Sequence, residues 1–133
     1  MILLDANIIL RFVLANDPEL SPKAEIIFKK IEQGKAKIQI TLLAFSEVVF
    51  TLERAYKMPK AEITQKLLSL LQLNNLKFEK QDMLPAVFEY YHEKNISFID
   101  AYHIALMNKK KIVEIYSFDR DFDKFPKVKR LEN

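Results

Sequence analysis

The feature that most constrains the fold of this chain is an alternation of short β-rich runs with longer segments of helical periodicity. Because parallel strands need a crossover connection, usually a helix, this alternation predicts a three-layer α/β/α sandwich with a mainly parallel sheet. The expected strands are residues 1–4, 37–41, 76–79, 112–116 and 128–131, and the expected helices are residues 6–14, 21–33, 43–56, 60–71, 82–94 and 98–109, with a turn or short helix at 119–122.

Glycine and proline mark the ends of one helix. Ser21 and Pro22 are typical of an N-cap and a first helical position, and Gly34 is expected to stop the same helix. Gly34 is also the only glycine of the chain. A glycine-rich loop that cradles phosphate is therefore absent, which excludes P-loop and Rossmann nucleotide-binding proteins.

Length and composition indicate one globular domain over residues 1–133. The chain has 50% hydrophobic and 29% charged residues, which is typical of a soluble protein. No apolar run is long enough for a transmembrane helix, and residues 1–4 lead directly to Asp5, unlike a signal peptide. We therefore expect a cytoplasmic protein with no membrane partner. The absence of cysteine excludes disulfides and thiolate metal sites, and two histidines argue against zinc.

Four carboxylates stand in apolar sequence. Asp5 follows the first expected strand, Asp119 follows the fourth, Asp100 lies between Ile99 and Ala101, and Glu47 lies within the apolar run 42–52. A charge at the end of a buried strand is costly unless a counter-charge meets it, and sites in parallel sheets lie beyond the carboxyl ends of the strands. The four side chains are therefore expected to converge on a Mg²⁺ or Mn²⁺ ion, since both prefer oxygen ligands.

The net charge is +3 although the chain contains this acidic group. The remaining surface is therefore more basic than the total implies, which suits a metal-dependent enzyme acting on a phosphate backbone. Carboxylate-bound divalent ions supply what phosphodiester hydrolysis needs: a hydroxide nucleophile, charge neutralisation and a stabilised leaving oxygen.

Four motifs in order resemble the PIN-domain family, and within it the compact VapC-type toxins. The motifs are Leu-Asp-Ala-Asn-Ile-Ile-Leu-Arg-Phe from residue 4, Ser-Glu-Val-Val from residue 46, Phe-Ile-Asp-Ala-Tyr-His-Ile-Ala from residue 98, and Tyr-Ser-Phe-Asp-Arg-Asp-Phe from residue 116. The resemblance covers the whole chain. It implies a Mg²⁺- or Mn²⁺-dependent endoribonuclease that acts on RNA and is paired with an antitoxin protein that occludes the site.

The same resemblance assigns roles to individual residues. It implies that Asp5, Asp100 and Asp119 are metal ligands, and that Glu47 is a ligand or the base that positions a water. Two supporting roles follow: Asp121 would lie in the outer part of the site, and Asn7 would hydrogen-bond to Asp5 or to a metal-bound water. The apolar content of residues 43–56 and 84–98, together with the habit of PIN relatives, predicts a homodimer.

Several alternatives remain open at this stage. Asp5 and Asp100 could simply cap the helices that follow them, and Glu47 could face solvent. The chain could also be a non-catalytic PIN-fold protein that binds RNA or acts as a scaffold. A haloacid-dehalogenase phosphohydrolase is disfavoured because Asn7 replaces the second acid of its Asp-x-Asp motif, and no aspartate matches that of a response-regulator receiver. A calcium loop from Asp119 is disfavoured because Lys124 replaces its glycine.

Overall fold

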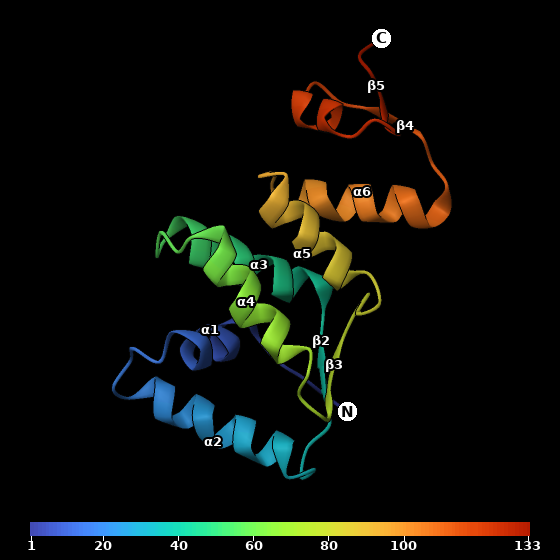
Figure 1. Ribbon diagram of the computed structural model, residues 1–133. Helices are drawn as coiled ribbons and strands as arrows, with labels where there is room; N and C mark the ends of the chain where they lie inside the picture. Colours follow the sequence, from blue (N-terminus) through green and yellow to red (C-terminus); the bar gives the residue numbers. More distant parts are fainter. The chain divides into compact units, whose positions relative to one another are not determined.

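The computed structural model describes residues 1–133 as two compact units, Met1–Gln81 and Asp82–Asn133, and each unit is described here by itself (Figure 1). The elements of the first unit are β1 (Ile2–Leu3), α1 (Ala6–Leu14), α2 (Leu20–Glu32), β2 (Ile38–Ile40), α3 (Leu42–Arg54), α4 (Lys60–Leu70) and β3 (Leu76–Phe78). The elements of the second unit are α5 (Leu84–Glu93), α6 (Phe98–Lys110), β4 (Glu114–Tyr116), the 3₁₀ helix η1 (Arg120–Lys124) and β5 (Lys129–Leu131).

All strand pairs are parallel. In the first unit the order is β1-β2-β3, with Ile2 opposite Ile38 and Ile38 opposite Leu76. In the second unit β4 pairs with β5, and Ile115 lies opposite Arg130. The prediction of an α/β fold with parallel strands is therefore confirmed. None of the helices combines the length and the apolar character that crossing a membrane requires.

Aromatic contacts hold the first unit together. Helices α1 and α2 form a hairpin, drawn in blue in Figure 1, and the rings of Phe12 and Phe28 stack across it at 3.9 Å between centroids. Phe45 of α3 meets Phe78 of β3 edge to face at 5.1 Å. Both kinds of ring pair add to the stabilisation that burial of the apolar surface provides.

The second unit has its own aromatic cluster. Phe88 and Tyr91 of α5 contact Phe98 of α6 at 5.4 and 6.2 Å between centroids, which joins the two helices near the start of α6. Tyr90 meets Phe125 edge to face at 5.4 Å and so ties α5 to the segment that follows η1. These contacts anchor α6 and the segment around η1 to the same helix.

The start of α2 corrects the sequence prediction. The helix begins at Leu20 and not at Pro22, because the Asp17 carboxylate accepts hydrogen bonds from the backbone N–H groups of Glu19 and Leu20 at 2.9 and 2.7 Å. The hydroxyl of Ser21 instead donates to the Arg11 carbonyl at 2.8 Å. The start of α2 is therefore set by a short loop that Asp17 closes, and not by Ser21 and Pro22.

The end of α2 follows the prediction. Gly34 has φ +76°, and the N–H of Lys35 returns to the carbonyl of Lys30 at 2.9 Å. This left-handed residue with a bond back into the last turn is the usual glycine stop of a helix.

The first and fourth strands are shorter than predicted. Strand β1 is only Ile2–Leu3, and both side chains are exposed, at 58% and 69%. Strand β4 begins at Glu114, so Ile112 and Val113 lie outside it. The expectation of a buried first strand, inferred from its apolar run, is wrong for these two side chains, because apolar character alone does not say which faces are covered.

Candidate metal centre

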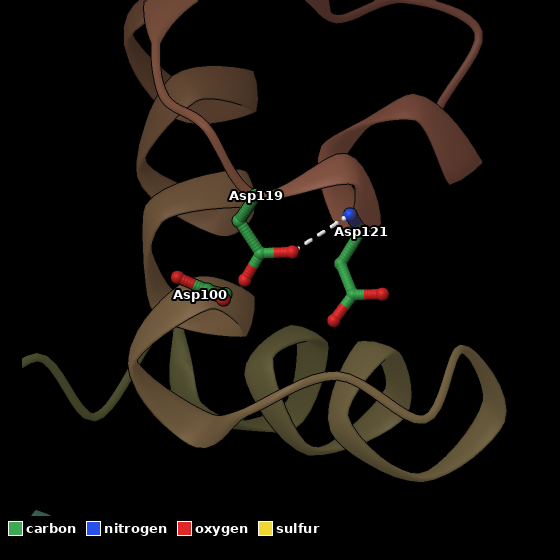
Figure 2. A group of neighbouring side chains, drawn as sticks. All are labelled: Asp100, Asp119 and Asp121. Atoms are coloured by element: carbon green, nitrogen blue, oxygen red, sulfur yellow. Dashed lines mark hydrogen bonds between the residues drawn. The ribbon is translucent and has the colours of Figure 1, made fainter.

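Three carboxylates of the second unit converge at one point. Asp100, Asp119 and Asp121 each offer an oxygen, and these oxygens all lie within 4.8 Å of one another. Figure 2 shows Asp100 on its helix with its carboxylate close to that of Asp119, and Asp121 beside them. The structure thus brings together two of the predicted metal ligands and one residue that was given a supporting role.

Asp100 is placed by the first turn of α6. Ser97 caps this helix, since its hydroxyl accepts a hydrogen bond from the backbone N–H of Asp100 at 3.1 Å. Asp100 is half-buried. Because Ser97 is the cap, the alternative that Asp100 itself caps the helix is wrong.

Asp119 is placed by two consecutive turns after β4. Its backbone N–H donates to the Ser117 hydroxyl at 3.0 Å, and its carboxylate accepts from the N–H of Asp121 at 2.9 Å. The second bond, the dashed line in Figure 2, makes Asp119 the N-cap of η1. Such short polar turns fix the local conformation of the backbone.

Asp121 lies beside Asp100 and Asp119 in the cluster. A lysine partly neutralises it: the Lys124 ammonium is 3.2 Å from the Asp121 carboxylate and donates to the Lys94 carbonyl at 3.0 Å. Sequence reasoning missed Lys124 as a neighbour of the site. The signal was available, because residues three apart in a helical turn face the same side.

Arg130 of β5 is a second residue that sequence reasoning missed. Its guanidinium binds both oxygens of Asp123 at 3.0 and 3.2 Å and donates to the Ser117 carbonyl at 3.1 Å. Hydrogen bonds to Asp123 and Glu132 raise the pKa of Arg130 above its usual value. This planar fork joins η1 to the end of β4 and thereby fixes the segment that carries Asp119 and Asp121.

The electrostatics of the cluster oppose ionisation of Asp100. Burial is the largest cause that raises the pKa of Asp100, and the negative charge and hydrogen bonding of Asp119 raise it further. A hydrogen bond with the Ser97 side chain and the charge of His103 act in the opposite direction. A carboxylate held against other carboxylates gains from a cation placed among them.

The donor set fits a hard divalent cation. All three groups offer oxygen, and Mg²⁺ and Mn²⁺ prefer carboxylate oxygens and water, whereas zinc sites usually include nitrogen or sulfur. The cluster is also open to solvent, because Asp119 is exposed. Water and a phosphate oxygen could therefore complete the coordination.

The other predicted residues belong to the first unit. Asp5 follows β1 at the N-cap position of α1 and is exposed, and its side chain makes no capping hydrogen bond. Asn7 is exposed in the first turn of α1, and no hydrogen bond joins it to Asp5. Glu47 is exposed on α3, whereas its neighbours Val48 and Val49 are buried.

Comparison with known proteins places the chain in a family. The family model of the PIN domain matches residues 2–128. The VapC ribonuclease of Aquifex aeolicus (strain VF5) is 26% identical over 124 residues, which cover 93% of this chain and 91% of that protein. Among solved structures, VapC20 of Mycobacterium tuberculosis, a sarcin–ricin loop cleaving toxin, aligns with 96% of this chain and 98% of its own, at 22% identity and a TM-score of 0.40. The predicted resemblance is confirmed, and the chain belongs to the PIN domain family.

Proposed function

We propose that this chain is a divalent-metal-dependent endoribonuclease that hydrolyses RNA phosphodiester bonds and serves as the toxin of a toxin–antitoxin pair. The observation that carries the proposal is the convergence of Asp100, Asp119 and Asp121 within 4.8 Å in a PIN-domain chain. The likeness to a VapC ribonuclease over 93% of the chain supports the same activity.

In this proposal Asp5, Asp100 and Asp119 hold one or two Mg²⁺ or Mn²⁺ ions. A bound ion would supply a hydroxide at neutral pH and would neutralise charge on the phosphate. Asp121 supports the site by holding Lys124 and by donating its N–H to Asp119. Glu47 accepts a proton from the attacking water or binds the ion, and Asn7 hydrogen-bonds to a water of the site.

The biological setting follows from the same resemblance. We propose that the substrate is RNA, that an antitoxin protein covers the acidic site, and that the chain works as a homodimer in the cytoplasm. The exposed apolar side chains include Leu43 and Phe50 of α3, at 84% and 58%, which provide surface for a partner.

The test is cleavage of a labelled RNA by the purified protein with Mg²⁺, with Mn²⁺ and with a chelator. We expect cleavage with either ion, none with the chelator, and a nearly complete loss in Asp119→Asn. Glu89→Gln is the matched control, since it removes one negative charge from an exposed site on α5 of the same unit. Cleavage that survives both the chelator and Asp119→Asn would contradict the proposal. Binding of RNA without any cleavage in either metal would favour the non-catalytic alternative.

A further inference from the structure

Two side chains next to Asp119 are exposed and have no partner. Phe118 is 84% exposed and stacks on no other ring. Arg120 is exposed, and its guanidinium makes neither an ion pair nor a hydrogen bond. An aromatic ring left in water forgoes the stabilisation that burial would provide, so its exposure beside a candidate catalytic cluster calls for a physical account.

Hydrogen bonds fix the backbone on both sides of Phe118 and Arg120. Phe118 lies at the apex of the turn closed by the Asp119 N–H and the Ser117 hydroxyl at 3.0 Å. Arg120 lies at the apex of the next turn, closed by the Asp121 N–H and the Asp119 carboxylate at 2.9 Å. Phe118 and Arg120 are therefore the middle residues of two turns with a fixed backbone, and both side chains are exposed. Asp119 takes part in both turns. It therefore links Phe118 and Arg120 to the carboxylate cluster along the chain.

An aromatic ring and a free guanidinium are complementary to a nucleotide. Single-stranded RNA exposes flat bases that stack on aromatic side chains, and its phosphates bind arginine through paired hydrogen bonds. The Arg120 guanidinium forms no ion pair with a carboxylate of the chain, so it is available to bind a polyanion. Arg130 of the same unit is not available, since its guanidinium is bound to Asp123.

We infer that Phe118 and Arg120 form a nucleotide-binding subsite in which Phe118 stacks on the base beside the scissile phosphate and Arg120 binds a neighbouring phosphate. The inference rests on the proposed ribonuclease function and names the residues that position the substrate. Stacking on Phe118 tolerates any base but favours unpaired ones, so the subsite selects single-stranded or looped RNA over duplex.

The test measures RNA binding and cleavage separately. A short RNA with 2-aminopurine beside its cleavage site reports stacking through quenching of its fluorescence, and binding in chelator avoids cleavage during the measurement. We expect Phe118→Ala to weaken binding and raise KM by about five- to 150-fold, equivalent to about 1–3 kcal/mol, and to abolish the quenching. Phe118→Tyr should restore both, whereas Phe118→Leu should not, because only an aromatic ring stacks.

The arginine is tested by the salt dependence of binding. Arg120→Gln should weaken binding to RNAs of any sequence and lower the slope of log affinity against log salt by about one phosphate contact. Two exposed residues of the first unit provide matched controls: Ile26→Ala removes apolar surface from α2, and Lys66→Gln removes one positive charge from α4. Both controls should bind and cleave as the parent does.

The outcomes separate this inference from the proposed function. A parent that neither binds nor cleaves RNA contradicts the proposed function and leaves nothing for the subsite to position. A parent that cleaves while Phe118→Ala and Arg120→Gln cleave and bind equally well overturns the subsite alone. Lower thermal stability in Phe118→Ala, with full activity and stability in Phe118→Leu, would show that the ring packs within the chain, and this too overturns it.

Discussion

The carboxylate of Asp119 accepts a hydrogen bond from the backbone N–H of Asp121 at 2.9 Å, which ties two acidic residues into one short turn. The turn brings Asp121 to the same point as Asp119 and Asp100. Because the bond is local, conservative substitutions at these two residues should test chemistry more than folding.

Substitution of Glu47 should show whether this residue acts as a base or as a metal ligand. As a base, Glu47→Gln should lower kcat by about 10²- to 10⁴-fold, with no change in the affinity for metal, because a positioned proton acceptor contributes about that factor. Asp5→Asn should instead weaken metal binding and cleavage together. Calorimetric titration of Mn²⁺ and single-turnover cleavage measure the two effects. Full activity of both variants would show that Asp5 and Glu47 do not belong to the site.

Metal should stabilise the parent, and loss of one carboxylate should stabilise the metal-free protein. Asp119 raises the pKa of Asp100, so ionised Asp100 is disfavoured in the folded chain. For such a group the free energy of unfolding is greatest below pH 3.8, the ordinary pKa of the carboxyl group. It falls as pH rises through the raised pKa of the folded chain. At pH 7 Asp119→Asn should therefore melt higher than the metal-free parent, and Mn²⁺ should raise only the parent's Tm appreciably. Thermal scans with and without a chelator provide the measurement.

Asp17 should make the stability of the first unit depend on acid pH. Hydrogen bonds from the N–H groups of Leu20 and Glu19, and then the charge of Arg11, lower the pKa of Asp17 from its ordinary value of 3.8. Its contribution is thus complete above pH 3.8 and is lost as pH falls through the folded pKa. Urea unfolding should show Asp17→Ala less stable than the parent at pH 6, with a smaller difference near pH 2.5. A difference independent of pH would contradict this account.

Gly34 should resist replacement because of its backbone conformation and not for lack of space. A side chain at this position would meet only Asn75, at 3.9 Å, but φ is +76°. Gly34→Ala should therefore cost about 1–2 kcal/mol in free energy of unfolding, the price of a left-handed conformation for an L-residue. Gly34→Asn should cost less, since asparagine tolerates that region. Equal losses in the two variants would point to another cause.

An antitoxin should silence the site with an arginine. Its guanidinium offers a planar fork that matches carboxylate oxygens and stays charged when desolvated, so it can take the place of the metal among the acids. Inhibition by the purified partner should then depend on one basic residue and weaken with excess Mn²⁺. Alanine variants of each basic residue, titrated in the cleavage assay, supply the test. If every variant inhibits as well as the parent partner does, the arginine account is wrong and steric covering alone explains the inhibition.

Much of the fold was predictable from local sequence patterns. The helix at residues 6–14 was predicted with both its ends, and the α/β alternation led to the parallel pairing that the strands adopt. These features depend on short-range periodicity and on the general need for crossover connections. The start of α2 was not predicted, because the capping carboxylate of Asp17 lies outside the helix and competes with the Ser-Pro signal that marks it.

The acidic residues show the boundary between sequence and tertiary structure. Their identities and order along the chain were sufficient to indicate a PIN domain and an oxygen-ligand metal site. Sequence spacing could not show that Asp121 lies beside Asp100 and Asp119, because its position depends on the turn at Asp119, the ion pair with Lys124 and the bonds of Arg130 to Asp123. The sequence specifies the residue types, and these determine which chemistry is possible. Distances between oxygens arise only when turns, helix starts and strand pairs bring separate segments together, so tertiary structure alone decided which carboxylates meet.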